Sequence, residues 1–241
     1  MNRKEYFDDY LSTHFSRNAG QDDKRDGLEF ATFDKNFGPV LPKSKNAKIL
    51  EIGFGTGFFL KYLVKNGYTN VKGIELSAEE TDYVRVNVYS EVEAVETTEG
   101  YLAEHLKEYD FIVMLDVLEH IPKTDTINFL RCIHASLADG GQLLVRVPNG
   151  SNPLNIQMFV CDFTHEFIYS TESLRQVNSL ARFSKSEVRP FKEEGMSTHG
   201  RITNVTQPIM FFLLRMLMGL NRSYQNNESF YTRTIFCISK K

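Results

Sequence analysis

The chain has 241 residues, of which 41% are hydrophobic and 24% are charged, and its formal net charge is −3. This length excludes a mini-protein that needs disulfides or metal ions to fold, because a chain of this size can bury enough apolar surface without them. The mildly acidic balance gives no basic excess, so we expect no nucleic-acid partner.

Three cysteines, Cys132, Cys161 and Cys237, lie far apart in the sequence. Their odd number and wide spacing argue against a disulfide framework and a zinc motif, so we expect a cytoplasmic protein without a metal site. No apolar run approaches the roughly 20 residues of a membrane span, and the first residues lack the apolar segment of a signal peptide. We therefore predict no transmembrane segment.

Residues 1–46 are polar and charged, and we expect them to form a helical cover ahead of the sheet. From residue 47 onward, apolar runs alternate with segments of helical spacing. The predicted strands are 47–52, 71–76, 91–95, 109–115 and 142–147, and the predicted helices are 58–65, the segment capped by Ser77, and 126–138. This alternation predicts βαβ units in a mostly parallel α/β sheet with helices on both faces.

The regular alternation of predicted strands and helices ends after residue 150. We expect a loop or lid over 152–168, a helix over 171–181, and strands over 183–190 and 230–239. Segment 209–220 is apolar on nearly every face apart from Arg215 and is too short to span a bilayer. The simplest prediction is a buried packing helix; contact with a second copy or a lid, and contact with a membrane surface, are the alternatives.

Three glycines at alternate positions, Gly53, Gly55 and Gly57, separate the first strand from the first helix of this alternation. Glycine permits a sharp turn and a close approach of backbone to a ligand. A dinucleotide fingerprint would place its last glycine at Phe58, and no lysine follows at P-loop spacing, so both of these motifs are excluded. Glu51, just before the turn, can hold an ammonium group. The alternative is a tight turn without a ligand.

Two further acids end strands of the predicted sheet. Glu75 follows the glycine turn by about 20 residues, where a carboxylate can accept hydrogen bonds from both ribose hydroxyls. Asp116 ends the strand 109–115 and is followed closely by Glu119 and His120. Because the carboxyl ends of parallel strands share one edge of a sheet, these acids are expected beside the glycine turn. An exposed strand-end carboxylate is the alternative for Glu75.

These segments together, 49–57, 73–77, 109–122 and 137–149, resemble in order and spacing the motif series of class I S-adenosylmethionine-dependent methyltransferases. The resemblance covers roughly residues 47–150 and implies a Rossmann-like doubly wound sheet with an antiparallel C-terminal strand. It implies one domain over 1–241, in which 47–150 bind the cofactor and 151–241 form a substrate lid and complete the sheet.

By this resemblance the methionine part of S-adenosylmethionine is surrounded by Glu51, Gly53, Phe54, Gly55, Thr56, Gly57, Asp116 and Val117. Glu75, with Leu76, is implied at the ribose. The family's usual acid near the adenine amine is missing, because Thr97 occupies the best-aligned position. Thr97, Thr98 or Glu96 is therefore the candidate for that contact.

The residues directly after the strand 109–115 suggest the subclass. Adenine and glutamine N-methyltransferases carry an Asn/Asp-Pro-Pro-aromatic tetrapeptide there, whereas residues 116–119 read DVLE. The segment resembles small-molecule O-methyltransferases, which include ubiquinone-biosynthesis and sugar enzymes. Residues 147–149 and 162–174, with 6–11 and His14, are similar to a group from bacterial capsule and O-antigen biosynthesis. A saccharide hydroxyl is thus the implied acceptor. A quinone-type enzyme at the membrane surface and a non-catalytic cofactor-binding protein are the alternatives.

A hydroxyl acceptor needs a base near neutral pH, for which histidine is suited. We favour His165 as this base, with Glu166 or Asp162 orienting it, and His120 as the alternative or as part of the cofactor's surroundings. Both histidines follow predicted strand ends, where ligands bind in open α/β sheets. The competing interpretation is that both are structural.

Overall fold

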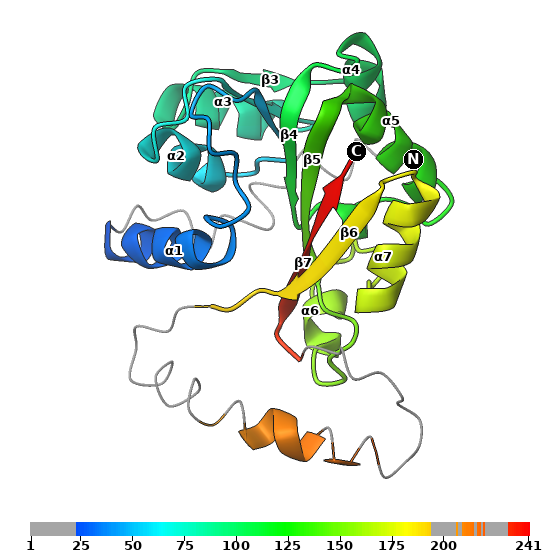
Figure 1. Ribbon diagram of the computed structural model, residues 1–241. Helices are drawn as coiled ribbons and strands as arrows, with labels where there is room; N and C mark the ends of the chain where they lie inside the picture. The colour runs from blue at the N-terminus through cyan, green and yellow to red at the C-terminus, as the bar shows by residue number, and fades with distance from the viewer. Residues whose placement is uncertain (1–22, 194–205, 207–208, 215, 218, 220–230) are drawn as a thin grey trace.

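The computed structural model describes residues 23–193, 206, 209–214, 216–217, 219 and 231–241 (Figure 1). Within this part of the chain, seven strands form one sheet in the order β3-β2-β1-β4-β5-β7-β6. The strands are β1 Ile49–Ile52, β2 Val71–Glu75, β3 Val92–Ala94, β4 Tyr109–Leu115, β5 Leu137–Pro148, β6 Lys185–Pro190 and β7 Thr234–Lys240. The first five pair in parallel, whereas β7 is antiparallel to both β5 and β6. The expected Rossmann-like fold with an antiparallel C-terminal strand is confirmed.

Helices cover both faces of the sheet. They are α1 Asp23–Asn36, α2 Phe58–Lys65, α3 Ala78–Asn87, α4 Thr98–Glu104, α5 Thr126–Ser136, α6 Ile156–Val160 and α7 Thr171–Leu180, with a 3-10 turn, η3, at Leu118–His120. In Figure 1, α1, α2 and α3 lie on one side of the sheet, and α4, α5 and α7 lie on the other. Two hydrophobic clusters fill the spaces between these layers.

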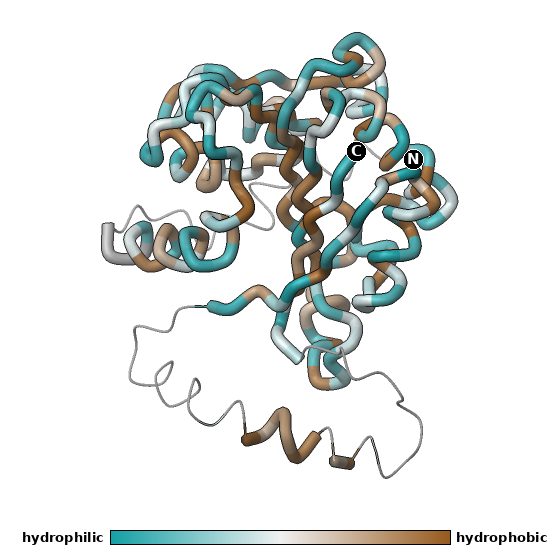
Figure 2. The backbone as a smooth tube through the Cα atoms, viewed as in Figure 1, coloured by the Kyte–Doolittle hydropathy of each residue, from teal (hydrophilic) through white to brown (hydrophobic). Residues whose placement is uncertain are grey.

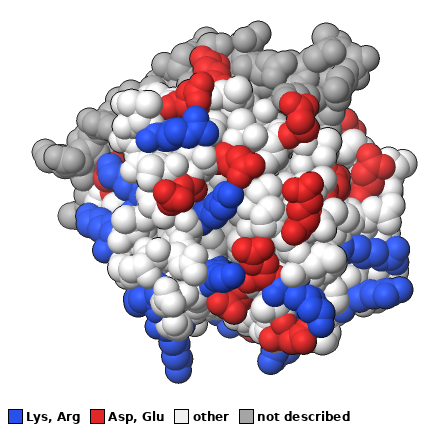
Figure 3. Space-filling view, turned by 90° about the horizontal axis from the view of Figure 1, so that it is seen from above, with Lys and Arg blue, Asp and Glu red and all other residues white. Residues whose placement is uncertain are grey.

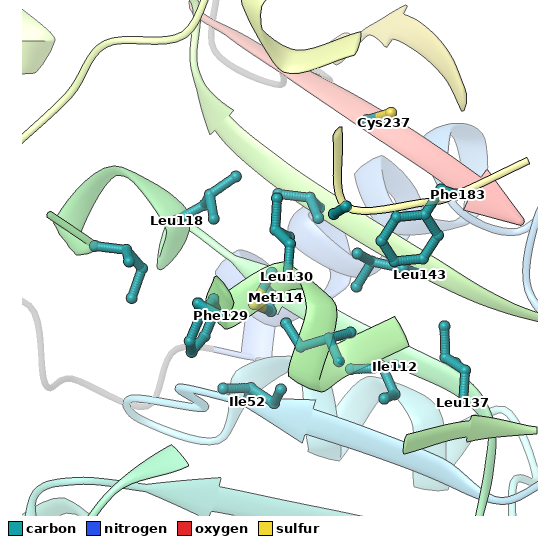
Figure 4. Packing of buried hydrophobic residues seen from close by; sticks show 14 of the residues in the cluster. Ile52, Ile112, Met114, Leu118, Phe129, Leu130, Leu137, Leu143, Phe183 and Cys237 are labelled. Atoms are coloured by element: carbon teal, nitrogen blue, oxygen red, sulfur yellow. The ribbon is translucent and has the colours of Figure 1, made fainter. Parts of the chain in front are cut away.

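Successive side chains along a strand belong alternately to the two clusters, because they point to opposite faces of the sheet. On β4, Ile112 and Met114 join the cluster under α4, α5 and α7, whereas Phe111 and Val113 join the cluster under α1 and α2. Figure 2 shows a brown, hydrophobic stretch of trace at the central strands of the sheet, and Figure 4 shows Ile112 and Met114 packed with Phe129 and Leu130 of α5.

Several boundaries differ from the sequence expectation. Helix α5 ends at Ser136, two residues before its predicted end, because Leu137 already pairs with Tyr109 of β4. The turn-forming residues 139–141 therefore lie within an irregular start of β5. The loop expected over 152–168 contains the short helix α6. The closing strand begins at Thr234, and residue 230 lies outside the described part.

The described residues of 209–220 are helical, as predicted, but the prediction that this helix is buried was wrong. Among the described residues of this segment, Ile209, Phe212 and Leu217 are 61%, 63% and 64% exposed. The two clusters are filled by other elements, and hydrophobicity alone could not show that this segment has no place between them. Contact with a second copy, a lid or a membrane surface stays a prediction. No described helix is long and apolar enough to cross a bilayer.

The amino-terminal motifs at 6–11 and His14 lie outside the described residues. Figure 3 looks down on the end of the molecule at the top of Figure 1, where lysines and arginines alternate with aspartates and glutamates over the described surface. Neither sign of charge gathers into a single patch on this face. The absence of a nucleic-acid partner stays a prediction.

Candidate active site

The glycine turn, residues 53–57, packs closely against the residues that follow β4. Gly53, Gly55 and Gly57 have φ angles of 70°, 50° and 73°, in the left-handed region that favours glycine. A Cβ on Gly53 would lie 2.5 Å from Cγ2 of Val117, the second residue after β4. A glycine is therefore required at this position both for the backbone angle and for the space.

Glu75 fixes the tip of β2 against this turn. Its Oε2 accepts a hydrogen bond from the backbone N–H of Gly55 at 3.3 Å, and its Oε1 accepts one from the N–H of Leu76 at 2.7 Å. Carboxylate oxygens have lone pairs for further donors such as ribose hydroxyls. The predicted neighbourhood of the glycine turn, Glu75 and Leu76 is thus found in the structure.

Glu51 is a buried acid at the carboxyl end of β1. It is 2% exposed, and its Oε2 has no hydrogen-bond partner among the described residues. Burial and the nearby charge of Glu75 raise the pKa of Glu51 well above its usual value. Leaving a buried carboxylate oxygen without a partner costs free energy, so this atom is suited to receive the ammonium group of a ligand.

The other residues expected at the cofactor differ in their surroundings. The side chain of Phe54 is 5% exposed and belongs to the cluster under α1 and α2. Thr97 caps α4 by accepting from the N–H of Gly100 at 3.1 Å, and Thr98 is buried. Thr56 and Val117 are half-buried beside the turn.

Asp116 is paired with an arginine that the sequence analysis did not single out. The Nε atom of Arg146 on β5 donates to Oδ1 of Asp116 at 3.1 Å, and Nη2 donates to Oδ2. Asp116 has a φ of 58°, which is uncommon for a residue other than glycine and is often found at functional sites. The signal that could have revealed Arg146 is a charged residue within the apolar run 143–147.

His120 and His165 are brought together from segments far apart in the sequence. Their ring centroids are 4.8 Å apart. Backbone hydrogen bonds hold the two segments, since the N–H groups of Glu166 and Phe167 donate to the carbonyl oxygen of Glu119 at 2.8 and 3.2 Å. Both candidate bases therefore belong to one site.

Each ring is held through Nδ1. The carbonyl oxygen of Phe159 lies 2.8 Å from Nδ1 of His165 and can only accept, so this nitrogen carries the hydrogen. Nδ1 of His120 lies 2.8 Å from Oγ1 of Thr164, whose hydroxyl donates to Oδ1 of Asp162 at 2.7 Å. Nδ1 of His120 is therefore also a donor.

The hydrogen-bond partners of the two histidines differ from the predicted ones. A backbone carbonyl, rather than the carboxylate of Glu166 or Asp162, holds Nδ1 of His165. Asp162 acts through Thr164 on His120, and the side chain of Glu166 is exposed. Burial, together with the neighbouring His165, lowers the pKa of His120 to about 4, so His120 is neutral near pH 7.

Glu119 completes the cluster and was not assigned a role from the sequence. It is 1% exposed, and neither carboxylate oxygen has a hydrogen-bond partner within the described structure. Burial and the nearby charge of Asp116 raise its pKa well above the usual value. One ligand atom each of Glu119, His120 and His165 lie within 4.8 Å of one another, a donor set that could hold a metal ion.

Three asparagines fix the loop that follows β5. Their side-chain amides donate to backbone carbonyl oxygens of residues 231–233, just before β7. The pairs are Asn149 with Thr232 at 2.9 Å, Asn152 with Tyr231 at 2.8 Å, and Asn155 with Arg233 at 2.6 Å. The loop beyond the carboxyl end of β5 is therefore attached to a segment far away in the sequence.

Comparison with known proteins agrees with this geometry. Residues 21–184 match a family described as a methyltransferase domain. A ubiquinone biosynthesis O-methyltransferase from Klebsiella pneumoniae is 28% identical over 109 residues, which are 42% of this chain and 43% of the relative. The aligned part thus spans less than half the length of that relative.

Two solved structures share the fold over nearly the whole chain. A SAM dependent methyltransferase from Archaeoglobus fulgidus has a TM-score of 0.67 at 16% identity, covering 98% of this chain and 99% of its own. A possible histamine N-methyltransferase from Thermotoga maritima has a TM-score of 0.64 at 17% identity, with the same coverage. Since the family match spans more than half of the chain, this protein belongs to the methyltransferase domain family.

Proposed function

We propose that this methyltransferase transfers a methyl group from S-adenosylmethionine to a hydroxyl group of a small molecule. The observation that carries the proposal is the His120–His165 pair, in which both Nδ1 atoms are donors to other groups. A neutral imidazole that donates through Nδ1 has its lone pair on Nε2. His165 therefore offers a proton-accepting atom next to the acids at the strand ends, as a hydroxyl acceptor requires.

The residues at the strand ends suit the cofactor. Glu51 would hold its ammonium group, Glu75 its ribose hydroxyls, and the glycine turn would let its chain approach the backbone closely. S-adenosylmethionine supplies an electrophilic methyl group on a positively charged sulfur. His165 would accept the hydroxyl proton through Nε2, so that the acceptor oxygen can form its bond to the methyl carbon while the carbon–sulfur electrons remain on sulfur.

Glu51→Gln is expected to weaken S-adenosylmethionine binding by about 10- to 100-fold, because a hydrogen bond to a charged group contributes about 1.5–3 kcal/mol. Calorimetric titration measures this change. Glu104→Gln, at an exposed position of α4, is the matched control and should bind like the wild type. Equal affinity of Glu51→Gln and the wild type would contradict the assignment.

The same variant is expected to gain stability without ligand at neutral pH. The pKa of Glu51 is raised in the folded protein, so its contribution to stability is present below the usual value of 4.5 and is lost as the pH rises through the folded pKa. Glutamine avoids this loss. Thermal unfolding near pH 8 and near pH 4 should therefore show a gain for Glu51→Gln at the higher pH only.

His165→Asn is expected to lower turnover at least tenfold, about 1.4 kcal/mol of barrier, with S-adenosylmethionine affinity unchanged. The assay measures S-adenosylhomocysteine release with a hydroxyl acceptor. His134→Asn is the control, because His134 lies on α5 against Phe183, outside the cluster. A smaller loss of turnover with intact cofactor binding would remove His165 from the proposed mechanism.

The acceptor we propose is a saccharide hydroxyl, on the basis of the motifs at 147–149 and 162–174. A quinone-type phenol is the second candidate, favoured by the identity to the Klebsiella enzyme. Turnover with nucleotide sugars and with prenylated catechols in vesicles separates the two. Amines tested in parallel distinguish O- from N-methylation, and a lack of S-adenosylhomocysteine release with every hydroxyl acceptor would defeat the proposal.

A further inference from the structure

Glu80, in the first turn of α3, is a buried acid that the proposed function leaves unused. It is 3% exposed, and its Oε1 atom has no hydrogen-bond partner among the described residues. The free energy lost with the hydration of a buried polar atom is recovered only through a new hydrogen bond. The position of this carboxyl group therefore calls for a separate explanation.

A role in capping α3 does not explain the carboxyl group of Glu80. An acid three residues after a serine cap often accepts a hydrogen bond from the N–H of that serine. Here Oγ of Ser77 accepts from the N–H of Glu80 at 3.3 Å, but between these two described residues the return bond is not made. Burial raises the pKa of Glu75, and backbone hydrogen bonds from Leu76, Gly55 and Ser77 oppose the rise. The N–H of Ser77 thus serves Glu75 rather than Glu80.

The face of α3 that carries Glu80 lies against the glycine turn. A Cβ on Gly57 would lie 2.8 Å from Cγ1 of Val84. Residues four positions apart share one face of a helix, so Glu80 lies on this face one turn before Val84. The charges that act on Glu80 are those of Glu75, at the tip of β2, and of Glu79, on α3. Glu80 is therefore placed beside the carboxylate proposed to hold the ribose, the sugar that carries the adenine ring of the cofactor.

The surroundings of Glu80 favour a protonated carboxyl group. Burial, together with the charges of Glu75 and Glu79, raises the pKa of Glu80 to about 8. Near pH 7 the group is therefore mostly neutral, with an O–H donor beside an acceptor oxygen. Adenine carries the complementary pair, an amino N–H donor next to a ring nitrogen that accepts, which is why glutamine and asparagine bind it through two hydrogen bonds. A protonated glutamate offers the same pair of groups.

We infer that Glu80 binds the adenine ring of S-adenosylmethionine, accepting from the amino group and donating to the neighbouring ring nitrogen. The inference rests on the proposed function and fills the adenine contact, for which the sequence offers Thr97, Thr98 or Glu96. The best-aligned of these, Thr97, already accepts from the N–H of Gly100 as the cap of α4. A carboxyl group that reaches the base from α3 would satisfy both the adenine edge and its own unpaired oxygen.

The experiment measures, by calorimetry at about pH 7, the binding of S-adenosylhomocysteine and of its analogue with hydrogen in place of the adenine amino group. We expect the wild type to bind S-adenosylhomocysteine at least tenfold more tightly than the analogue, and Glu80→Ala to lose this preference. Glu79→Ala, at the exposed neighbouring position of α3, is the control and should bind both ligands like the wild type. Equal binding of the two ligands by the wild type, or an unchanged preference in Glu80→Ala, would overturn the inference.

A pH series with Glu80→Gln keeps the inference testable if Glu80→Ala does not fold. Glutamine presents a donor and an acceptor at every pH, whereas the carboxyl group of the wild type loses its proton as the pH rises through about 8. Between about pH 7 and about pH 9.5, the wild type's affinity for S-adenosylhomocysteine should therefore fall at least threefold relative to that of Glu80→Gln. A constant ratio between the two proteins would contradict the inference.

A third ligand distinguishes the adenine ring from the ribose. The 2′-deoxy analogue of S-adenosylhomocysteine keeps the amino group but lacks one of the hydroxyls assigned to Glu75. If Glu80→Ala weakened the binding of S-adenosylhomocysteine but not of this analogue, Glu80 would bind the ribose and the inference would be wrong. Failure of the wild type to bind S-adenosylhomocysteine at all would defeat the proposed function, whereas intact binding without a preference for the amino group defeats only the assignment of Glu80.

Discussion

Gly53→Ala is expected to weaken S-adenosylmethionine binding at least 100-fold, about 2.7 kcal/mol, and to lower the stability of the protein. The new Cβ would lie 2.5 Å from Cγ2 of Val117, on a backbone whose φ of 70° disfavours any side chain. Valine has a stiff, branched side chain that cannot rotate away freely, so the turn itself must move. Calorimetric titration and thermal unfolding measure the two effects.

Two further variants separate the steric clash from the backbone cost. Gly67 has a φ of 82° but no atom within 4 Å of an added Cβ, so Gly67→Ala should cost only the roughly 1–2 kcal/mol of the left-handed conformation. The double variant Gly53→Ala with Val117→Ala removes Cγ2 and should recover much of the lost affinity. If the double variant binds as weakly as Gly53→Ala, the contact with Val117 is not the cause.

Phe37→Ala is expected to reduce the free energy of unfolding by about 3–5 kcal/mol, the range for removing a buried phenylalanine. Phe37 is fully buried directly after α1. Its ring centroid lies between 5.2 and 5.7 Å from those of four other phenylalanines, Phe33, Phe59, Phe191 and Phe236. The truncation would leave a cavity where α1, α2 and β7 meet.

Urea unfolding followed by circular dichroism measures this loss. Val86→Ala is the control, because Val86 on α3 is 81% exposed and should change stability by less than about 0.5 kcal/mol. A loss below about 1.5 kcal/mol for Phe37→Ala would mean that α1 does not depend on this ring for its place against the sheet.

The parallel core of the fold was predictable because its signals are local. Apart from Asp110, the strand 109–115 is a continuous apolar run between turn residues, as a strand buried on both faces requires, and it appears with the same bounds in β4. Ser77 was recognised as a helix cap from its own sequence, and its Oγ accepts from the N–H of Glu80 at 3.3 Å. The glycine turn was also predictable, because its three glycines lie close together in the sequence.

Features that depend on tertiary contacts could not be predicted from the sequence. Arg146 looks like an interruption of an apolar strand until β4 brings Asp116 beside it. The approach of His165 to Glu119 joins segments separated by about 45 residues, and no spacing rule links them. Hydrophobicity predicted burial for 209–220, but burial requires a free place in the core, and sequence composition carries no information about that place.

The position of β7 sets an order for folding. Within the described part of the chain, β7 is the only neighbour of β6 in the sheet, and β7 follows β6 by more than 40 residues. During synthesis β5 would therefore expose an unpaired edge until β7 arrives, a state that favours aggregation. Because the asparagines after β5 bond to residues 231–233, the loop beside the site would be fixed in the same step. A nascent chain would thus acquire its parallel core early and a competent site late.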